Sequence, residues 1–153
     1  MITVEIQGAK ELIGQLDKLR DATGDLRLVD GWKDCINAFY KLEKAQFAGE
    51  GIGASGAWKA LTPKYATWKS KKYGALPINQ RTKALYRSLT SKTGDSVVDE
   101  QAQELTIGTT VSYSGYVQKA RPVIDFTPEQ EKQLLQPIEK KIRQLLQNLR
   151  LRG

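Results

Sequence analysis

Aromatic and basic side chains are concentrated between residues 55 and 74, where the chain reads SGAWKALTPKYATWKSKKYG. Lysines contact nucleic-acid phosphates and exposed aromatic rings stack on bases, so one interpretation is a nucleic-acid surface. A second is a protein interface, because Trp and Tyr are enriched in interface cores and the charges could pair with an acidic partner. The third is an ordinary amphipathic helix, since a spacing of three, four and three would place four apolar side chains on one packing face: Trp58, Leu61, Tyr65 and Trp68.

The basic residues of this segment belong to a longer block that contains no acid. Residues 51–94 lack Asp and Glu and hold nine of the 24 basic residues, whereas the remaining fifteen are set against 17 acidic residues. A helix surface that only contacts solvent usually mixes both signs, because acid–base pairs one turn apart are stabilising. The block therefore predicts a contact with something negative, either a polyanion or an acidic protein surface. No helix-turn-helix, RNA-recognition or zinc-finger pattern accompanies it.

The residue types that most enzymes use are missing. The chain has no histidine, and its single cysteine, Cys35, can form neither a zinc site nor an intrachain disulfide. No acidic cluster suggests a magnesium site. No apolar run approaches the roughly 20 residues of a membrane helix, and the first residues lack the pattern of a secretion signal. We therefore expect no enzymatic activity, no cofactor, no metal and no membrane partner.

Short strands and helices must position the basic aromatic segment. Alternating apolar residues predict a strand over 2–6, and the apolar runs at 97–98 and 105–108 predict a hairpin. Apolar residues three to four apart predict helices over 9–20 and about 26–48. Because helices and strands do not alternate regularly, the predicted class is α+β, with a small, mostly antiparallel sheet flanked by helices.

Within the basic block, a loop and two short helices are predicted. Residues 49–56 include four glycines, so we expect a flexible loop, which either orders only on assembly or simply connects two elements. Thr62-Pro63 predicts the start of a helix that stops at Gly74. Thr82 is expected to cap a second short helix over 83–91, with its leucines on one face.

A long helix is predicted at the C-terminus. Thr127-Pro128 resembles the earlier helix start, with Gln130 in the capping-box position, and the apolar stripe continues to about Leu149. Pro137 should either kink this helix or mark its true start. With no internal repeat or low-complexity tract, we expect one domain over residues 1–153.

A series of short motifs follows a fixed order along the middle of the chain. A phenylalanine precedes the glycine loop, then come a Trp-x-x-Leu element, a lysine-rich helix, a Thr-x-x-Leu-x-x-Ser element, a tyrosine element ending in Val-Gln, and Ala-Arg-Pro. In this sequence they are Phe47, Trp58–Leu61, Lys69 with Lys71 and Lys72, Thr82–Ser88, Tyr113–Gln118 and Ala120–Pro122. In order and spacing the series resembles the phage virion morphogenesis, or tail completion, protein family of long-tailed phages. The resemblance covers about residues 36–126.

The chain departs from the family pattern at three places. The glycine that follows the threonine of the Thr-x-x-Leu element is Lys83 here, and the glycine that follows Gln118 is Lys119. The usual Pro-Phe-Leu-Gly ending is replaced by Pro122 to Asp125. The resemblance therefore rests on the order of the motifs and not on any one of them.

The resemblance implies a structural role without catalysis. Members of the family look like neck or tail-terminator components at the head-proximal end of the tail, in rings commonly of six subunits. The implied partners are further copies of the chain, the head connector and the tail tube proteins, with genomic DNA passing through the lumen without sequence specificity. The implied location is the neck or tail of the virion, after assembly in the host cytoplasm. The implied fold, a small sheet flanked by helices, agrees with the α+β class predicted from the element order.

In a ring around DNA, the positive side chains of the basic block would have a binding role. These side chains are then expected to face the channel or an acidic neighbouring ring, and the candidates are Lys69, Lys71, Lys72, Arg81, Lys83 and Arg87. Trp58, Tyr65 and Trp68 would pack within the subunit or against the next one, since a closed ring needs two different contact patches on each subunit. The alternative function is a sequence-independent nucleic-acid-binding protein that uses the basic segment 57–92.

Overall fold

A three-stranded antiparallel sheet joins the start of the chain to its middle. The computed structural model describes residues 1–6, 29–101 and 104–152. The strands are β1 (Ile2–Ile6), β2 (Ser96–Glu100) and β3 (Leu105–Thr109), and they lie in the order β1-β3-β2. The predicted first strand and the predicted hairpin are therefore confirmed.

The central strand β3 takes its register from both neighbours. Val4 of β1 and Val98 of β2 both lie opposite Ile107, which is buried in the core. A β-carbon at Gly108 would overlap the backbone of Ile2 and Thr3. A glycine at this point therefore lets β1 approach β3 closely.

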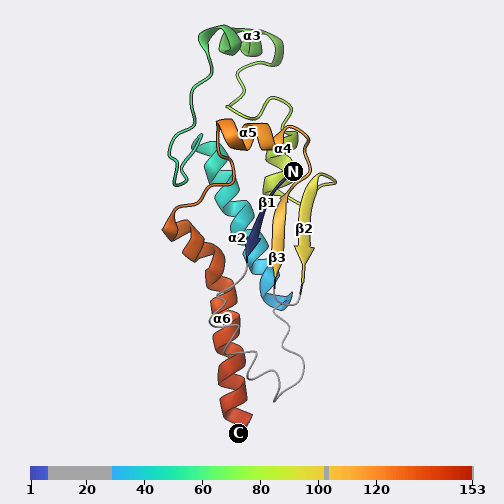
Figure 1. Cartoon of the computed structure of the whole chain (residues 1–153), viewed down its shortest axis with the longest axis vertical. Coiled ribbons are helices and arrows are strands. Elements are labelled where there is room, and N and C mark those ends of the chain that lie inside the picture. The colour runs from blue at the N-terminus through green and yellow to red at the C-terminus, as the bar shows by residue number, and fades with distance from the viewer. Residues whose placement is uncertain (7–28, 102–103, 153) are drawn as a thin grey trace.

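Two long helices pack side by side next to the sheet (Figure 1). They are α2 (Val29–Ala48) and α6 (Pro128–Arg152), and the short α4 (Ala84–Thr90) contacts α2 as well as β2 and β3. Apolar side chains from these elements form one core, which includes Trp32, Cys35, Phe39, Phe47, Leu85, Leu89, Leu105, Ile107, Leu134, Ile138 and Ile142. The fold is α+β with a long C-terminal helix, as the element order predicts.

The C-terminal helix begins where its capping residues predict. The Thr127 N–H donates to Gln130 Oε1 at 2.8 Å, and the Gln130 N–H donates to Thr127 Oγ1 at 3.3 Å. This reciprocal pair is a capping box, and it satisfies two amide groups at the helix start. Pro137 lies inside α6 and does not mark its start; the N-terminal turns of α6 run at an angle to the rest of the helix (Figure 1).

Two of the shorter helices differ from the prediction. Lys83, and not Thr82, occupies the N-cap position of α4 and has a left-handed backbone with φ 59°, whereas Thr82 Oγ1 accepts a bond from the Ala84 N–H at 3.4 Å. The helix α5 (Ser114–Ala120) has no counterpart among the predicted elements, since its polar sequence carries no apolar stripe. The predicted helix over 9–20 and the first residues of the helix over 26–48 lie outside the described residues.

The glycine-rich loop 49–56 is joined to the domain by hydrogen bonds along its length. The Ile52 N–H donates to Gln46 Oε1 at 2.7 Å, and the Ser55 N–H donates to Asp125 Oδ2 at 2.7 Å. A β-carbon at Gly53 would overlap the carbonyl oxygen of Asp125. The glycine content therefore allows close approach to the segment before α6, so the loop has a defined path against the domain.

Candidate interaction surface

The basic aromatic segment divides into a buried part and a projecting part. The helix α3 (Pro63–Tyr73) begins after Thr62, which caps it, and so it excludes Trp58 and Leu61. Trp58 is 7% exposed in the core, whereas Tyr65 and Trp68 are 39% and 43% exposed. The prediction of one shared packing face is therefore wrong, because the cap and Pro63 start the helix five residues beyond Trp58.

Trp58 belongs to a buried junction with the segment that follows α5. Its indole Nε1–H donates to the Pro122 carbonyl at 2.7 Å, and its ring packs edge-on against Phe47 with centroids 5.3 Å apart. Arg121 Nε donates to the Lys59 carbonyl at 2.6 Å, and Arg121 Nη2 reaches the Ala60 carbonyl at 3.4 Å. These contacts tie two segments together that are more than fifty residues apart in the sequence.

Gln118 organises the other side of this junction. Its Oε1 accepts hydrogen bonds from the N–H groups of Val123 (2.9 Å) and Ile124 (3.0 Å), and its Nε2 donates to the Ile124 carbonyl at 2.8 Å. A single side chain therefore fixes the turn that presents Arg121 and Pro122 to Trp58. We call Trp58, Gln118, Arg121 and Pro122 the motif junction.

The helix α3 lies at one end of the molecule, away from the sheet and from the C-terminus of α6 (Figure 1). We call residues 59–83, which lead to α3 and return from it, the arm. Its exposed rings touch one another, with centroids 5.4 Å apart for Tyr65 and Trp68 and 5.8 Å apart for Trp68 and Tyr73.

Two cations lie over these rings. Lys72 Nζ is 5.3 Å from the Trp68 centroid and 5.4 Å from the Tyr73 centroid, and the Arg81 guanidinium is 5.5 Å from Tyr73. Each such contact is worth about 0.5–1 kcal/mol at an exposed site. The five residues of the aromatic–cation cluster are Tyr65, Trp68, Lys72, Tyr73 and Arg81.

The candidate basic residues do not share one environment. Lys71, Lys72, Arg81, Lys83 and Arg87 are exposed. Lys69 is only 4% exposed, and its Nζ donates to the carbonyl oxygens of Leu76 (3.0 Å) and Pro77 (2.7 Å).

The prediction that Lys69 faces a channel or a partner is therefore wrong, since its ammonium group fastens α3 to the returning chain. Burial is the largest cause of the lowered pKa of Lys69, and nearby Glu50 partly opposes it. No signal in the sequence separates Lys69 from its neighbours, because its partners are backbone carbonyls placed by the chain path.

A buried carboxyl group in α2 has no counterpart among the predicted site residues. Glu43 is fully buried, and neither of its carboxyl oxygens has a hydrogen-bond partner among the described residues. Burial, and secondarily the charge of Asp125, raises the pKa of Glu43 well above its usual range, so its neutral form is favoured. The sequence holds a signal for the burial of Glu43, because this residue lies four positions from both Phe39 and Phe47 on the apolar stripe of α2.

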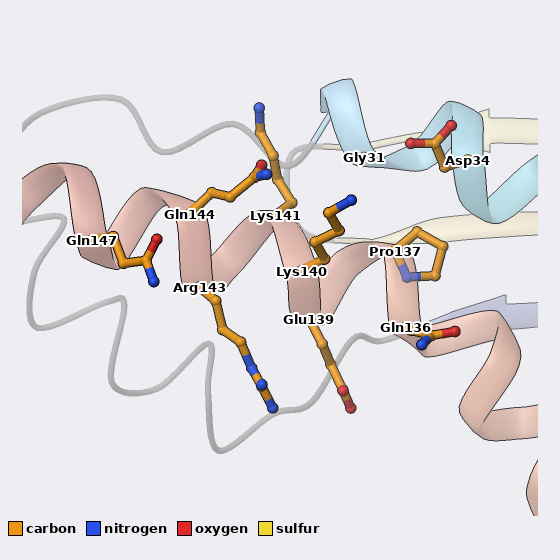
Figure 2. A pocket seen from close by; sticks show the side chains of 10 residues that line it. All are labelled: Gly31, Asp34, Gln136, Pro137, Glu139, Lys140, Lys141, Arg143, Gln144 and Gln147. Atoms are coloured by element: carbon orange, nitrogen blue, oxygen red, sulfur yellow. The ribbon is translucent and has the colours of Figure 1, made fainter.

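A hollow between α2 and α6, with a volume of about 970 Å³, is lined mostly by polar side chains (Figure 2). Glu139 and Arg143 project from one side of α6, whereas Gly31 and Asp34 lie on α2 on the other side. These side chains do not point toward a common position, so the hollow has no arrangement typical of a catalytic or binding centre.

The described residues contain neither a group of metal ligands nor a membrane-spanning helix. Within 1–6, 29–101 and 104–152, no three His, Cys, Asp or Glu side chains are grouped so as to hold a metal ion. None of the helices in those ranges is both long and apolar enough to cross a membrane.

Comparison with known proteins finds no relative: no family model, no curated protein and no solved structure matches the chain.

Proposed function

We propose that this chain is a structural protein of the phage neck, which completes or terminates the tail and joins it to the head connector as an oligomeric ring around the DNA channel. The motif junction carries this proposal. The motifs behind the resemblance are separated in the sequence, yet Trp58 bonds to Pro122 and Arg121 bonds to the backbone beside Trp58. Motifs that build one junction are a stronger sign of a shared fold than motifs that merely follow one another.

The departure at Lys83 also supports the proposal. The family pattern has a glycine at this position, and Lys83 has φ 59°, a left-handed conformation that glycine adopts without steric cost. The backbone at this position therefore has the left-handed conformation that the glycine of the family pattern would adopt easily, although the residue here is a lysine.

In such a ring, the exposed cations Lys71, Lys72, Arg81, Lys83 and Arg87 face the DNA channel or an acidic neighbouring ring. The role is positional and requires no catalytic group. The partners are further copies of the chain, in a hexamer by preference, together with the head connector and the tail tube. DNA passes without sequence readout, because contacts to phosphates carry no sequence information.

Electron microscopy and light scattering of the purified chain test this proposal. Rings with a central opening, formed alone or on tail tubes from the same phage, are the expected result. A strict monomer at high concentration that also ignores those tail tubes would overturn it.

A second candidate function is sequence-independent nucleic-acid binding, which the five exposed cations and the acid-free segment 51–94 favour. Binding to duplex DNA would then weaken steeply with salt, because each phosphate contact releases counterions. Lys71→Glu with Lys72→Glu should abolish it, whereas Lys33→Glu, an exposed site on the first turns of α2, should not. Absence of DNA binding at low salt would exclude this function.

A further inference from the structure

The arm is built as a preformed element. Thr62 caps α3 through a bond from the Tyr65 N–H to Thr62 Oγ1 at 3.4 Å, and the Gly74 N–H bonds back to the Ser70 carbonyl at 2.9 Å. Lys69 then ties the last turns of α3 to the returning chain through two carbonyls. These local bonds fix the helix without help from the main core, and ordering the arm on binding would therefore cost little.

Both limbs of the arm are fastened to the domain at its base. Arg121 holds the outgoing limb through the carbonyls of Lys59 and Ala60. Glu50 holds the returning limb, since its Oε1 accepts a bond from the Ile78 N–H at 3.0 Å. The arm therefore presents α3 in one orientation relative to the core.

Three aromatic rings on α3 are exposed to solvent and contact one another. Tyr65, Trp68 and Tyr73 are 39%, 43% and 36% exposed, and they form one continuous group. Grouped exposed rings beside cations are typical of the energetic centre of a protein interface, where Trp, Tyr and Arg dominate binding.

Charge decides what kind of surface can cover this group. The formal net charge of one copy is +7, and the arm contributes only positive side chains to it. Two copies that met arm to arm would repel each other, so the surface that covers the arm must carry negative charge.

The ring geometry separates an acidic protein from a nucleic acid. Stacking of bases requires free ring faces, but Lys72 lies over Trp68, and both Lys72 and Arg81 lie over Tyr73. The faces of Trp68 and Tyr73 are therefore partly covered by cations, and Tyr65 and Trp68 are tilted against each other with centroids 5.4 Å apart. Such a surface fits an apolar depression surrounded by carboxylates.

We propose that the arm binds an acidic surface of a different protein, with Tyr65, Trp68 and Tyr73 in an apolar depression and Lys71, Lys72 and Arg81 paired with carboxylates around it. The arm would bind such a partner whether or not the chain forms a ring, because the contact uses only residues of the arm.

The three tryptophans allow a direct test. Trp32 and Trp58 are 0% and 7% exposed, and their indole N–H groups donate to the carbonyls of Gln101 and Pro122, whereas Trp68 is 43% exposed. Indole N–H signals of the ¹⁵N-tryptophan-labelled full chain therefore report the arm and the core separately. The probes are an acidic amphipathic helical peptide, with leucines on one face and glutamates on the other, and a short DNA duplex.

The peptide should shift the Trp68 signal and leave those of Trp32 and Trp58 in place. The double substitution Lys71→Glu with Lys72→Glu should weaken binding about tenfold or more, and Tyr65→Ala, which keeps the Trp68 reporter, should weaken it by a similar factor. Lys33→Glu should change it less than twofold, since rim charges far from the contact have little effect. Unchanged signals of the two buried tryptophans verify that each variant is folded.

Three results would overturn the proposal. The first is a Trp68 signal that ignores the acidic peptide. The second is a DNA duplex that shifts Trp68 at lower concentration than the peptide does, which would assign the arm to nucleic acid. The third is a Trp68 signal that moves on dilution of the protein alone, which would assign the arm to a second copy of the chain.

Discussion

The left-handed residue Lys83 gives the sharpest prediction about this fold. Lys83 is exposed, precedes α4 and has φ 59° and ψ 5°. A non-glycine residue in this conformation costs about 1–2 kcal/mol, whereas glycine adopts it freely. Lys83→Gly removes this cost but adds about 0.4–1 kcal/mol of conformational freedom to the unfolded chain. The net expectation is a free energy of unfolding that rises by about 0.5–1 kcal/mol.

A matched substitution isolates the backbone effect. The described non-glycine residues with positive φ are Glu50, Asn79 and Lys83, so the exposed Lys92 has an ordinary backbone. Lys92→Gly should therefore destabilise the protein by about 0.4–1 kcal/mol through the unfolded chain alone. The difference between the two substitutions equals the strain at Lys83, about 1–2 kcal/mol.

Urea unfolding followed by far-ultraviolet circular dichroism measures both changes, and the slope of the transition should stay constant between variants. Lys83→Ala provides a further control, because alanine keeps the β-carbon and hence the strain, so its stability should remain within about 0.5 kcal/mol of the parent. If Lys83→Gly is no more stable than Lys83→Ala, the strain argument is wrong, and with it the reading of Lys83 as the counterpart of the family's glycine.

Three other predictions follow from buried groups. The raised pKa of Glu43 means that its stability contribution is fully present below the ordinary carboxyl value of 4.5 and is lost as pH rises through the folded value. The parent should therefore lose stability relative to Glu43→Gln by up to about 1.4 kcal/mol per pH unit in that window, and parallel urea titrations would contradict this. Trp58→Phe removes the shorter of two bonds to the Pro122 carbonyl, the other coming from Gln46 Nε2 at 3.2 Å, and should cost about 1 kcal/mol of unfolding free energy; an unchanged urea midpoint would show that the Trp58 bond contributes nothing. Burial raises the pKa of Cys35 to about 11, so its thiol should resist a disulfide reagent near pH 8 until urea unfolds the chain; rapid reaction of the folded protein would contradict its burial.

Local rules account for the parts of the fold that were predicted correctly. Thr62 with Pro63, and Thr127 with Gln130, start α3 and α6 because their side chains satisfy backbone groups within one turn. The strands and the apolar stripes follow from periodicity in the same way. A rule of this kind could place α4 only to within a residue, because it could not foresee the left-handed backbone at Lys83.

Residues of the basic aromatic segment that look alike in the sequence lie in different environments in the structure. Trp58 and Trp68 are equally apolar and lie ten residues apart, yet the core buries the first and the arm exposes the second. Lys69 resembles Lys71 and Lys72 in the sequence, but only Lys69 meets two backbone carbonyls. These differences follow from the path of the arm, whose base is bonded to Glu50 and Arg121.

By itself, the sequence determined the three strands, the helix starts of α3 and α6, and a positive block without acids. Those properties are local, because capping, periodicity and charge depend on residues within a few positions of one another. Only the tertiary structure decided that Trp58 joins Pro122 and that α3 projects on an arm. It also decided that Glu43 is buried with no hydrogen-bond partner among the described residues. Each of these depends on where distant segments meet, since burial and desolvation are set by the path of the whole chain.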